Sequence, residues 1–256
     1  MQPAIHRASS VIRYACIGLI LAFGLISAPS GSDPPADLAR KVAAVEAENA
    51  SSQANYTYRQ KVLIEELDDK GLRVGHYEEV RDITFSPEAG RSERFSGKPV
   101  SRLRRLQLTE EDFRDIREVQ PFLFTSEQLW AYQTRYRGEE LVEGAQCYLL
   151  EVRPRQTFEG QRLFEGTLWI DKKDFAVVRS EGQAVPAIFS KGEENLFPRF
   201  TTVRAKVDDR HWFPVITLAD DILPFRTGPI RIRMRIEYSN YKRFAADSTI
   251  KFQDPE

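Results

Sequence analysis

Three groups of neighbouring carboxylates, at residues 110–112, 208–209 and 220–221, are the side chains in this 256-residue chain best placed to do chemistry. Adjacent carboxylates can transfer protons in acid–base catalysis, and clustered carboxylate oxygens can bind Ca²⁺. The first group opens an expected helix, where negative charge is favourable beside the helix dipole. The other two fall in expected turns, where Asp is common. We therefore expect solvated helix-start and turn residues rather than an acid–base or calcium site.

Histidines and nucleophile motifs give no further indication of catalysis. His76 and His211 both lie in expected strands, and neither stands beside a nucleophile or a set of metal ligands. The sequence contains no G-x-S-x-G, H-E-x-x-H, G-x-x-x-x-G-K-[ST] or G-x-G-x-x-G motif. We predict that the protein is not an enzyme, holds no metal and uses no cofactor. A hydrolase without a familiar motif is the weaker alternative.

Three arginines alternate with apolar residues in the stretch PIRIRMRIEYSNY, residues 229–241. Such alternation is typical of a β-strand with one apolar and one charged face, and it sets Arg231, Arg233 and Arg235 about 7 Å apart on the charged face. Exposed guanidinium groups can bind phosphate through two parallel hydrogen bonds, so these arginines are a candidate docking surface for acidic lipid headgroups or an acidic partner. The favoured alternative is pairing with carboxylates of a neighbouring strand.

Strands must form most of the scaffold that positions these residues. The sequence predicts a hairpin of residues 56–67 and 72–85, followed by strands at 132–138, 146–153, 162–171, 176–183, 200–207, 211–218 and 230–238. Apolar residues at helical spacing predict helices at 38–45 and 109–119, the second with Thr109 as its N-cap. Serial strands joined by short turns favour an antiparallel meander, because parallel pairs would need helical crossovers.

The predicted fold class is mainly β (α+β), a curled antiparallel sheet that forms an incomplete β-barrel, with helices covering its concave face. Apolar residues inside and charged residues outside is the persistent pattern of the strands. We expect one inward face to line a lipid cavity, and its candidate residues are Tyr56, Tyr58, Val62, Ile64, Phe113, Ile116, Tyr148, Leu150, Val152, Phe164, Leu168, Ile170, Ile232, Met234 and Ile236. The many aromatic side chains can line such a cavity or simply fill the core.

The N-terminus is typical of an export signal. Arg7 and Arg13 precede an apolar run from Ala15 to Ile26, and small residues follow it. We predict a cleaved signal peptide at 1–30, a single domain at 31–256 and a periplasmic location. The alternative is an uncleaved leader that tethers the chain to the inner membrane. After cleavage Cys147 is the one remaining cysteine, which excludes an internal disulfide.

Residues 143–183 resemble the periplasmic lipoprotein-carrier family, LolA/LolB-like. The matching residues are Gly144, Tyr148, Leu150, Pro154, Leu168, Trp169, Ile170 and Asp171. The resemblance implies an incomplete antiparallel barrel of about eleven strands, with helices as a lid over an apolar cavity that takes acyl chains. There is no lipobox, so the chain does not resemble the receptor type anchored in the outer membrane.

The expected function is therefore non-enzymatic binding of lipid or lipoprotein acyl chains in an apolar cavity, with lipoprotein trafficking to the outer membrane as its context. The alternative is an envelope scaffold or stress sensor that acts by protein contact and has a filled core. Expected partners are acyl chains, and an envelope protein or the membrane surface. A formal net charge of −1 disfavours a nucleic-acid partner, and we expect a monomer.

Overall fold

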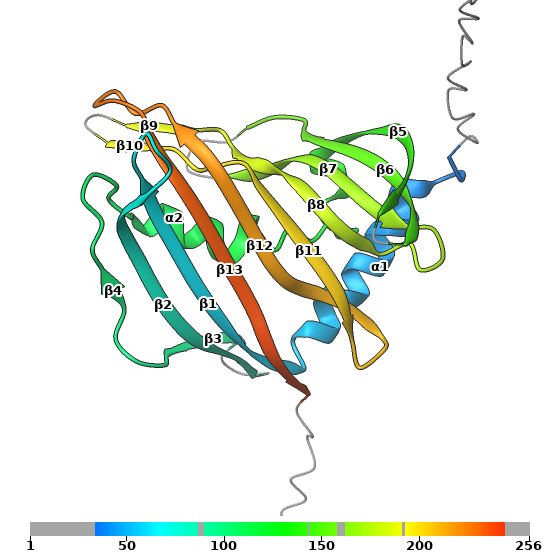
Figure 1. Ribbon diagram of the computed structural model, residues 1–256. Coiled ribbons are helices and arrows are strands. Elements are labelled where there is room, and N and C mark those ends of the chain that lie inside the picture. Colours follow the sequence, from blue (N-terminus) through cyan, green and yellow to red (C-terminus); the bar gives the residue numbers. More distant parts are fainter. Residues whose placement is uncertain (1–33, 87–89, 143, 158–161, 191–192, 244–256) are drawn as a thin grey trace, which may run out of the picture. The chain divides into compact units, whose positions relative to one another are not determined.

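The structure, a computed structural model, describes residues 34–86, 90–142, 144–157, 162–190 and 193–243 (Figure 1). The predicted signal peptide lies outside these residues. Within the described ranges, no helix combines the length and the apolar character needed to cross a bilayer.

A single eleven-stranded sheet forms the body of the described chain, and its strands run in the order β3-β2-β1-β13-β12-β11-β8-β7-β6-β5, with β4 paired to β2. The strands are β1 (Tyr56–Leu67), β2 (Arg73–Ser86), β3 (Gly90–Phe95), β4 (Val100–Ser101), β5 (Tyr132–Val142), β6 (Ala145–Pro154), β7 (Leu163–Asp171), β8 (Val177–Val185), β11 (Phe200–Val207), β12 (His211–Leu223) and β13 (Ile230–Arg243). The short strands β9 (Ile188–Ser190) and β10 (Glu193–Asn195) pair only with each other. The sheet is antiparallel and does not close, because β3 and β5 remain its edges. The predicted fold class is confirmed.

The order of the strands is the predicted meander with one long-range junction. From β5 to β13 each strand of the sheet pairs with the next one along the chain, and β1 to β3 do the same. The two runs meet where β13 pairs with β1, in a register that sets Val62 opposite Ile236 and Ile64 opposite Met234. This pairing brings apolar side chains from the two ends of the chain onto one face.

Two helices lie on the same side of this sheet (Figure 1). Helix α1 (Leu38–Gln53) extends beyond the predicted range 38–45, and α2 (Glu110–Arg114) continues into a π-helical turn, η1 (Asp115–Val119). Together α2 and η1 are the helix predicted at 109–119. A short 3₁₀ turn, η2 (Leu129–Ala131), precedes β5. We call the face that the helices cover the inner face, and the opposite one the outer face.

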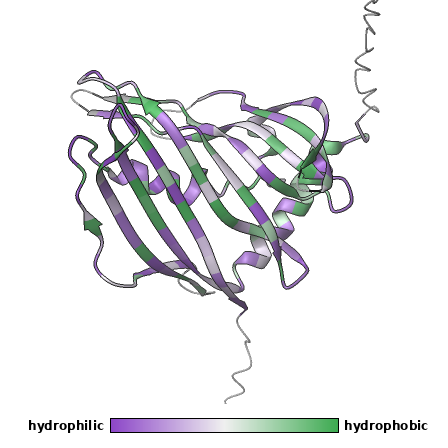
Figure 2. Cartoon of the chain, in the orientation of Figure 1, coloured by the Kyte–Doolittle hydropathy of each residue, from purple (hydrophilic) through white to green (hydrophobic). Residues whose placement is uncertain are grey.

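Apolar and charged residues alternate along the strands, so the inner face of the sheet is apolar and the outer face is charged. Figure 2 shows hydrophobic and hydrophilic residues following one another along the strands. The burial of β13 makes the period explicit, because Ile230, Ile232 and Met234 are buried while Arg231 and Arg233 are exposed. One buried cluster joins the inner face to side chains of α1 and η1.

Two glycines make room for a ring on the inner face. Gly166 of β7 lies opposite Gly182 of β8, and the ring of Phe164 lies against both. A Cβ on Gly166 would lie 2.7 Å from Phe164 Cζ and 2.2 Å from the carbonyl oxygen of Glu181. The sheet at this point therefore accepts no side chain larger than hydrogen.

Candidate functional site

The residues predicted to line a cavity come together on the inner face. All of them except Tyr56 belong to one apolar cluster or pack against it. Phe113 and Tyr148 are partly buried, and the others are buried. Tyr56 lies outside the cluster, where its hydroxyl donates to Asp208 Oδ2 at 2.7 Å and its ring meets Phe213 edge-on.

A covering segment, of which the lining prediction included only Phe113 and Ile116, packs on this face. After η1, Phe122 and Phe124 enter the cluster, and the Phe122 ring stacks on Phe164 with 4.6 Å between ring centroids. Before α2, Leu106 and Leu108 pack on the same cluster. We call residues 106–124 the cover. Their apolar residues show no regular spacing outside the helix, so periodicity alone did not indicate their burial.

A small gap remains between the cover and the sheet. Ile64, Ile232 and Met234 line it from the strands, and Leu106 and Leu108 line it from the cover. Its volume is about 20 Å³, which is room for about one water molecule. At this point the inner face is therefore nearly filled.

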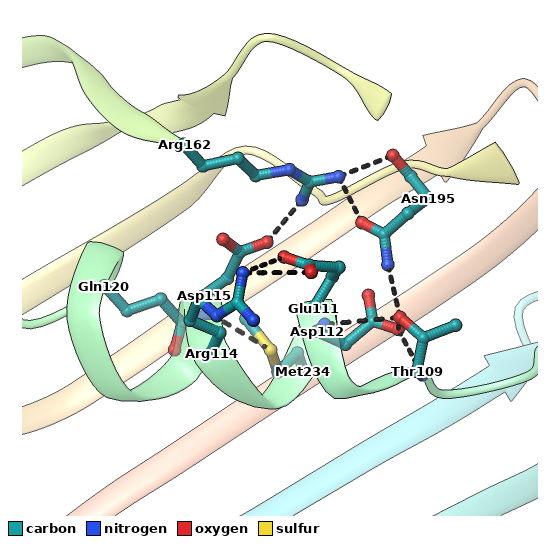
Figure 3. A network of polar contacts seen from close by, with 9 residues as sticks. All are labelled: Thr109, Glu111, Asp112, Arg114, Asp115, Gln120, Arg162, Asn195 and Met234. Carbon is teal, nitrogen blue, oxygen red and sulfur yellow. Dashed lines mark hydrogen bonds and ion pairs between the residues drawn. The ribbon is translucent and has the colours of Figure 1, made fainter. Parts of the chain in front are cut away.

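A buried polar network holds the cover against the residue that precedes β7 and against the last residue of β10 (Figure 3). Arg162 makes an ion pair with Asp115 and donates to the backbone oxygen of Asn195 at 2.6 Å. Asn195 Nδ2 in turn donates to Thr109 Oγ1 at 2.7 Å. Thr109 and Asp112 form the capping box of α2, as the N-cap prediction required.

Arg162 is the functional side chain of this network that sequence reasoning missed. The alternation of the strand 162–171 indicates only which residues face the core, and a charged residue at its start is expected to face water. Instead the side chain of Arg162 is 3% exposed and that of Asp115 is 1% exposed. The strand begins one residue later, at Leu163, so Arg162 is free to turn toward the cover.

Burial dominates the electrostatics of the cover. It raises the pKa of Asp115 to about 7, although the charge and hydrogen bond of Arg162 act in the opposite direction. Burial also raises the pKa of Asp112, against the hydrogen bonds from Thr109 and Asn195. Folding therefore favours the protonated forms of Asp112 and Asp115.

A second buried ion pair fixes α1 to the sheet. Arg204 Nη1 of β11 lies 2.6 Å from Glu46 Oε2, and both side chains are almost fully buried. Arg204 also donates to the backbone oxygen of Phe122, while the other Glu46 oxygen accepts from the Val177 amide. One guanidinium group thus joins α1, the sheet and the cover.

The three arginines predicted as a docking row lie exposed on the outer face, and each has an ion-pair partner. Arg231 and Arg233 contact Asp220 of β12 at 3.3 and 3.2 Å, and Arg235 contacts Glu237 at 2.7 Å. Asp220 and Asp221 lie within β12 rather than in a turn, which corrects the sequence prediction. The strand extends to Leu223 because β13 supplies pairing partners along that whole length.

The other side chains considered as candidates for chemistry lie in a turn, in the core or against an aromatic ring. Asp208 and Asp209 lie in the turn before β12, as predicted, and Cys147 is buried. His211 stacks on Phe213 with 5.8 Å between ring centroids. Within the described ranges, no group of three or more His, Cys, Asp or Glu side chains is arranged to hold a metal ion.

Comparisons with known proteins find several solved structures that are similar to this chain. A DUF1329 family protein from Desulfovibrio piger is 16% identical with a TM-score of 0.40, and the match covers 85% of this chain and 95% of that one. A LolA superfamily protein from Nitrosomonas europaea is 13% identical with a TM-score of 0.34, covering 82% and 98%. The MucA/MucB complex of Pseudomonas aeruginosa is 13% identical with a TM-score of 0.23, covering 78% and 98%. No family model and no curated protein matches the chain.

The fold and the covered inner face define an open antiparallel sheet protein with a helical lid over its apolar side. One of the similar solved structures is described as a LolA superfamily protein, and residues 143–183 resemble that family.

Proposed function

We propose that the protein is a non-enzymatic periplasmic binding protein that takes an acyl chain of a lipid or lipoprotein onto the inner face of its sheet. The observation that supports this best is the continuous apolar inner face under a cover made of one chain segment. A sheet face of this kind binds an apolar ligand by removing its surface from water.

Acyl binding requires the cover to move, because a gap of about 20 Å³ is too small for an acyl chain. Polar groups inside the cover favour such movement. A buried ion pair such as Asp115–Arg162 contributes little more than well-packed apolar residues would. Gln120 is fully buried, and its Oε1 has no hydrogen-bond partner among the described residues. An unsatisfied buried polar atom costs about 1–3 kcal/mol, which weakens the closed state.

A fluorescent fatty acid tests the proposal. We expect cis-parinaric acid, whose emission rises in apolar surroundings, to bind the wild-type protein saturably. Ile232→Trp introduces a side chain larger than the gap can hold, so it crowds the inner face and should weaken binding about tenfold or more. The matched control is Ile222→Trp, because Ile222 is an exposed residue on the same sheet. The affinity of this variant for the fatty acid should equal that of the wild type. Thermal unfolding checks that both variants fold. An absent signal in the wild type, or equal affinities in all three proteins, would contradict the proposal.

The alternative function, an envelope scaffold or stress sensor that acts by protein contact, is favoured by the same nearly filled inner face. Native mass spectrometry of protein purified from membrane-containing cells separates the two functions. A lipid adduct that is present in the wild type and absent from Ile232→Trp supports the binding protein. A bare polypeptide mass in both supports the scaffold.

A further inference from the structure

Basic side chains on the outer face of β1 and β13 have carboxylate partners. Arg59 pairs with Asp82 and Lys61 with Glu78 near one edge. In the central row, Arg231 and Arg233 share Asp220 while Arg235 contacts Glu237, so one positive charge is unbalanced although each arginine already has a partner.

The pairing of charged side chains differs on the outer face of β5, β6 and β7. Cross-strand register places Arg135 opposite Glu151, and Glu151 opposite Thr167, in one outward row. Glu151 binds two guanidinium groups, those of Arg137 and Arg153. Arg137 occupies the bulge between Tyr136 and Gly138, and the extra residue lets it reach the same carboxylate.

Two adjoining hollows lie over this row. One, of about 390 Å³, is lined by Gln133, Thr134, Arg135, Arg137, Glu151 and Arg153. The other, of about 250 Å³, shares the last three of these and adds Glu165, Gly166, Thr167 and Arg199.

Two of the lining guanidinium groups are free. Neither Arg135 nor Arg199 forms an ion pair with a described residue through its side chain, and both residues are exposed. Four arginines line the combined hollow against two glutamates, so two positive charges remain unbalanced. Because Glu151 holds two of the four guanidinium groups in place, part of the lining is ordered before any ligand arrives.

We propose that these adjoining hollows on the outer face of β5, β6 and β7 bind phosphate groups, with Arg135 as the principal ligand in the first hollow and Arg199 in the second. The oxygens of a phosphate dianion accept paired hydrogen bonds from guanidinium forks. The hydroxyls of Thr134 and Thr167 supply further donors at the hollow's wall and floor. The site is separate from the inner face and does not depend on acyl binding there.

Calorimetric titration with inorganic phosphate at low ionic strength tests the site. We expect saturable binding to the wild type, weakened about tenfold or more in Arg135→Gln/Arg199→Gln, because hydrogen bonds between charged groups are the strong ones. The matched control is Arg231→Gln/Arg233→Gln. It removes the same charge from the same face but from arginines that already have a partner, so its phosphate affinity should remain that of the wild type.

Sedimentation with vesicles identifies the source of the phosphate. Wild-type binding to phosphatidylglycerol vesicles but not to phosphatidylcholine vesicles, lost in Arg135→Gln/Arg199→Gln alone, indicates a lipid headgroup. Binding of inorganic phosphate without vesicle binding indicates a soluble phosphate ligand. The proposal is overturned if the wild type binds neither probe saturably, or if the control variant loses as much affinity as the test variant.

Discussion

At the scale of single residues, two buried arginines connect distant parts of the chain, whereas the exposed arginines of β13 do not. Arg162 and Arg204 each join three parts of the chain through one guanidinium group. The arginines of β13 lie in water, where each ion pair contributes at most about 1 kcal/mol. Sequence alternation located the exposed row correctly, but it could not indicate the buried arginines, because their partners lie far away along the chain.

Removing Glu46 should destabilise the protein strongly. Glu46→Ala leaves Arg204 as an unpaired buried charge, and we expect the free energy of unfolding to fall by about 3–5 kcal/mol. Urea unfolding measures the change. The control is Glu237→Ala, which removes the exposed partner of Arg235 and should cost about 1 kcal/mol or less. Similar losses in both variants would show that Arg204 finds water or another partner.

Asp115 should make stability depend on pH. Its pKa is about 7 in the folded protein against an ordinary value of 3.8, so folding favours the protonated form. The stabilisation is complete below about pH 4 and is lost as the pH rises through 7. Arg162 faces the carboxyl group as an ion-pair partner, and Asp112 and Glu111 add negative charge nearby.

Asp115→Asn keeps the shape of the protonated side chain and does not titrate. We expect the wild type to lose stability relative to this variant between pH 5 and pH 8, as measured by urea unfolding at each pH. A difference that stays constant, or one that grows in favour of the wild type as the pH rises, would mean that Arg162 outweighs burial.

At the scale of elements, the strands and helices were largely predictable, and the parts of the cover outside its helix were not. The hairpin 56–67 with 72–85, the strands from 132 onward and the capped helix at 109–119 all follow from local signals of alternation, turns and capping. The pairing of β13 with β1 and the burial of residues 120–124 depend on long-range contacts, which local patterns do not report. The predicted lining residues were brought onto one face because period two fixes the face once the strand is known.

The paired glycines of β7 and β8 give a prediction about a single element. Gly166→Ala places a Cβ against Phe164 and the Glu181 carbonyl, and we expect a loss of about 1–3 kcal/mol from overpacking. Thr167→Ala, the next residue on the outer face, is the control and should change stability much less. Thermal unfolding followed by circular dichroism measures both. Equal stability of Gly166→Ala and the wild type would mean that the strands separate at little cost.

At the scale of the whole molecule, one apolar cluster extends over the strands of both sheet halves and over the helices. The domain prediction for residues 31–256 therefore leads us to expect one cooperative unfolding transition. Trp fluorescence, which reports on Trp130, Trp169 and Trp212 in the later part of the chain, should change at the same urea concentration as far-ultraviolet circular dichroism. Two separate transitions would indicate that the hairpin half and the meander half unfold independently.

The junction of β13 with β1 also determines when the fold can form. Tyr56 pairs with Arg243, so the central seam of the sheet joins residues from nearly opposite ends of the described chain. Closing such a long loop costs conformational entropy before any contact repays it, and high contact order slows folding. A growing chain can build the β1–β2 hairpin early, but the edge of β1 that pairs with β13 stays without its partner until β13 has been synthesised. The native sheet can therefore be assembled only after β13 has been made.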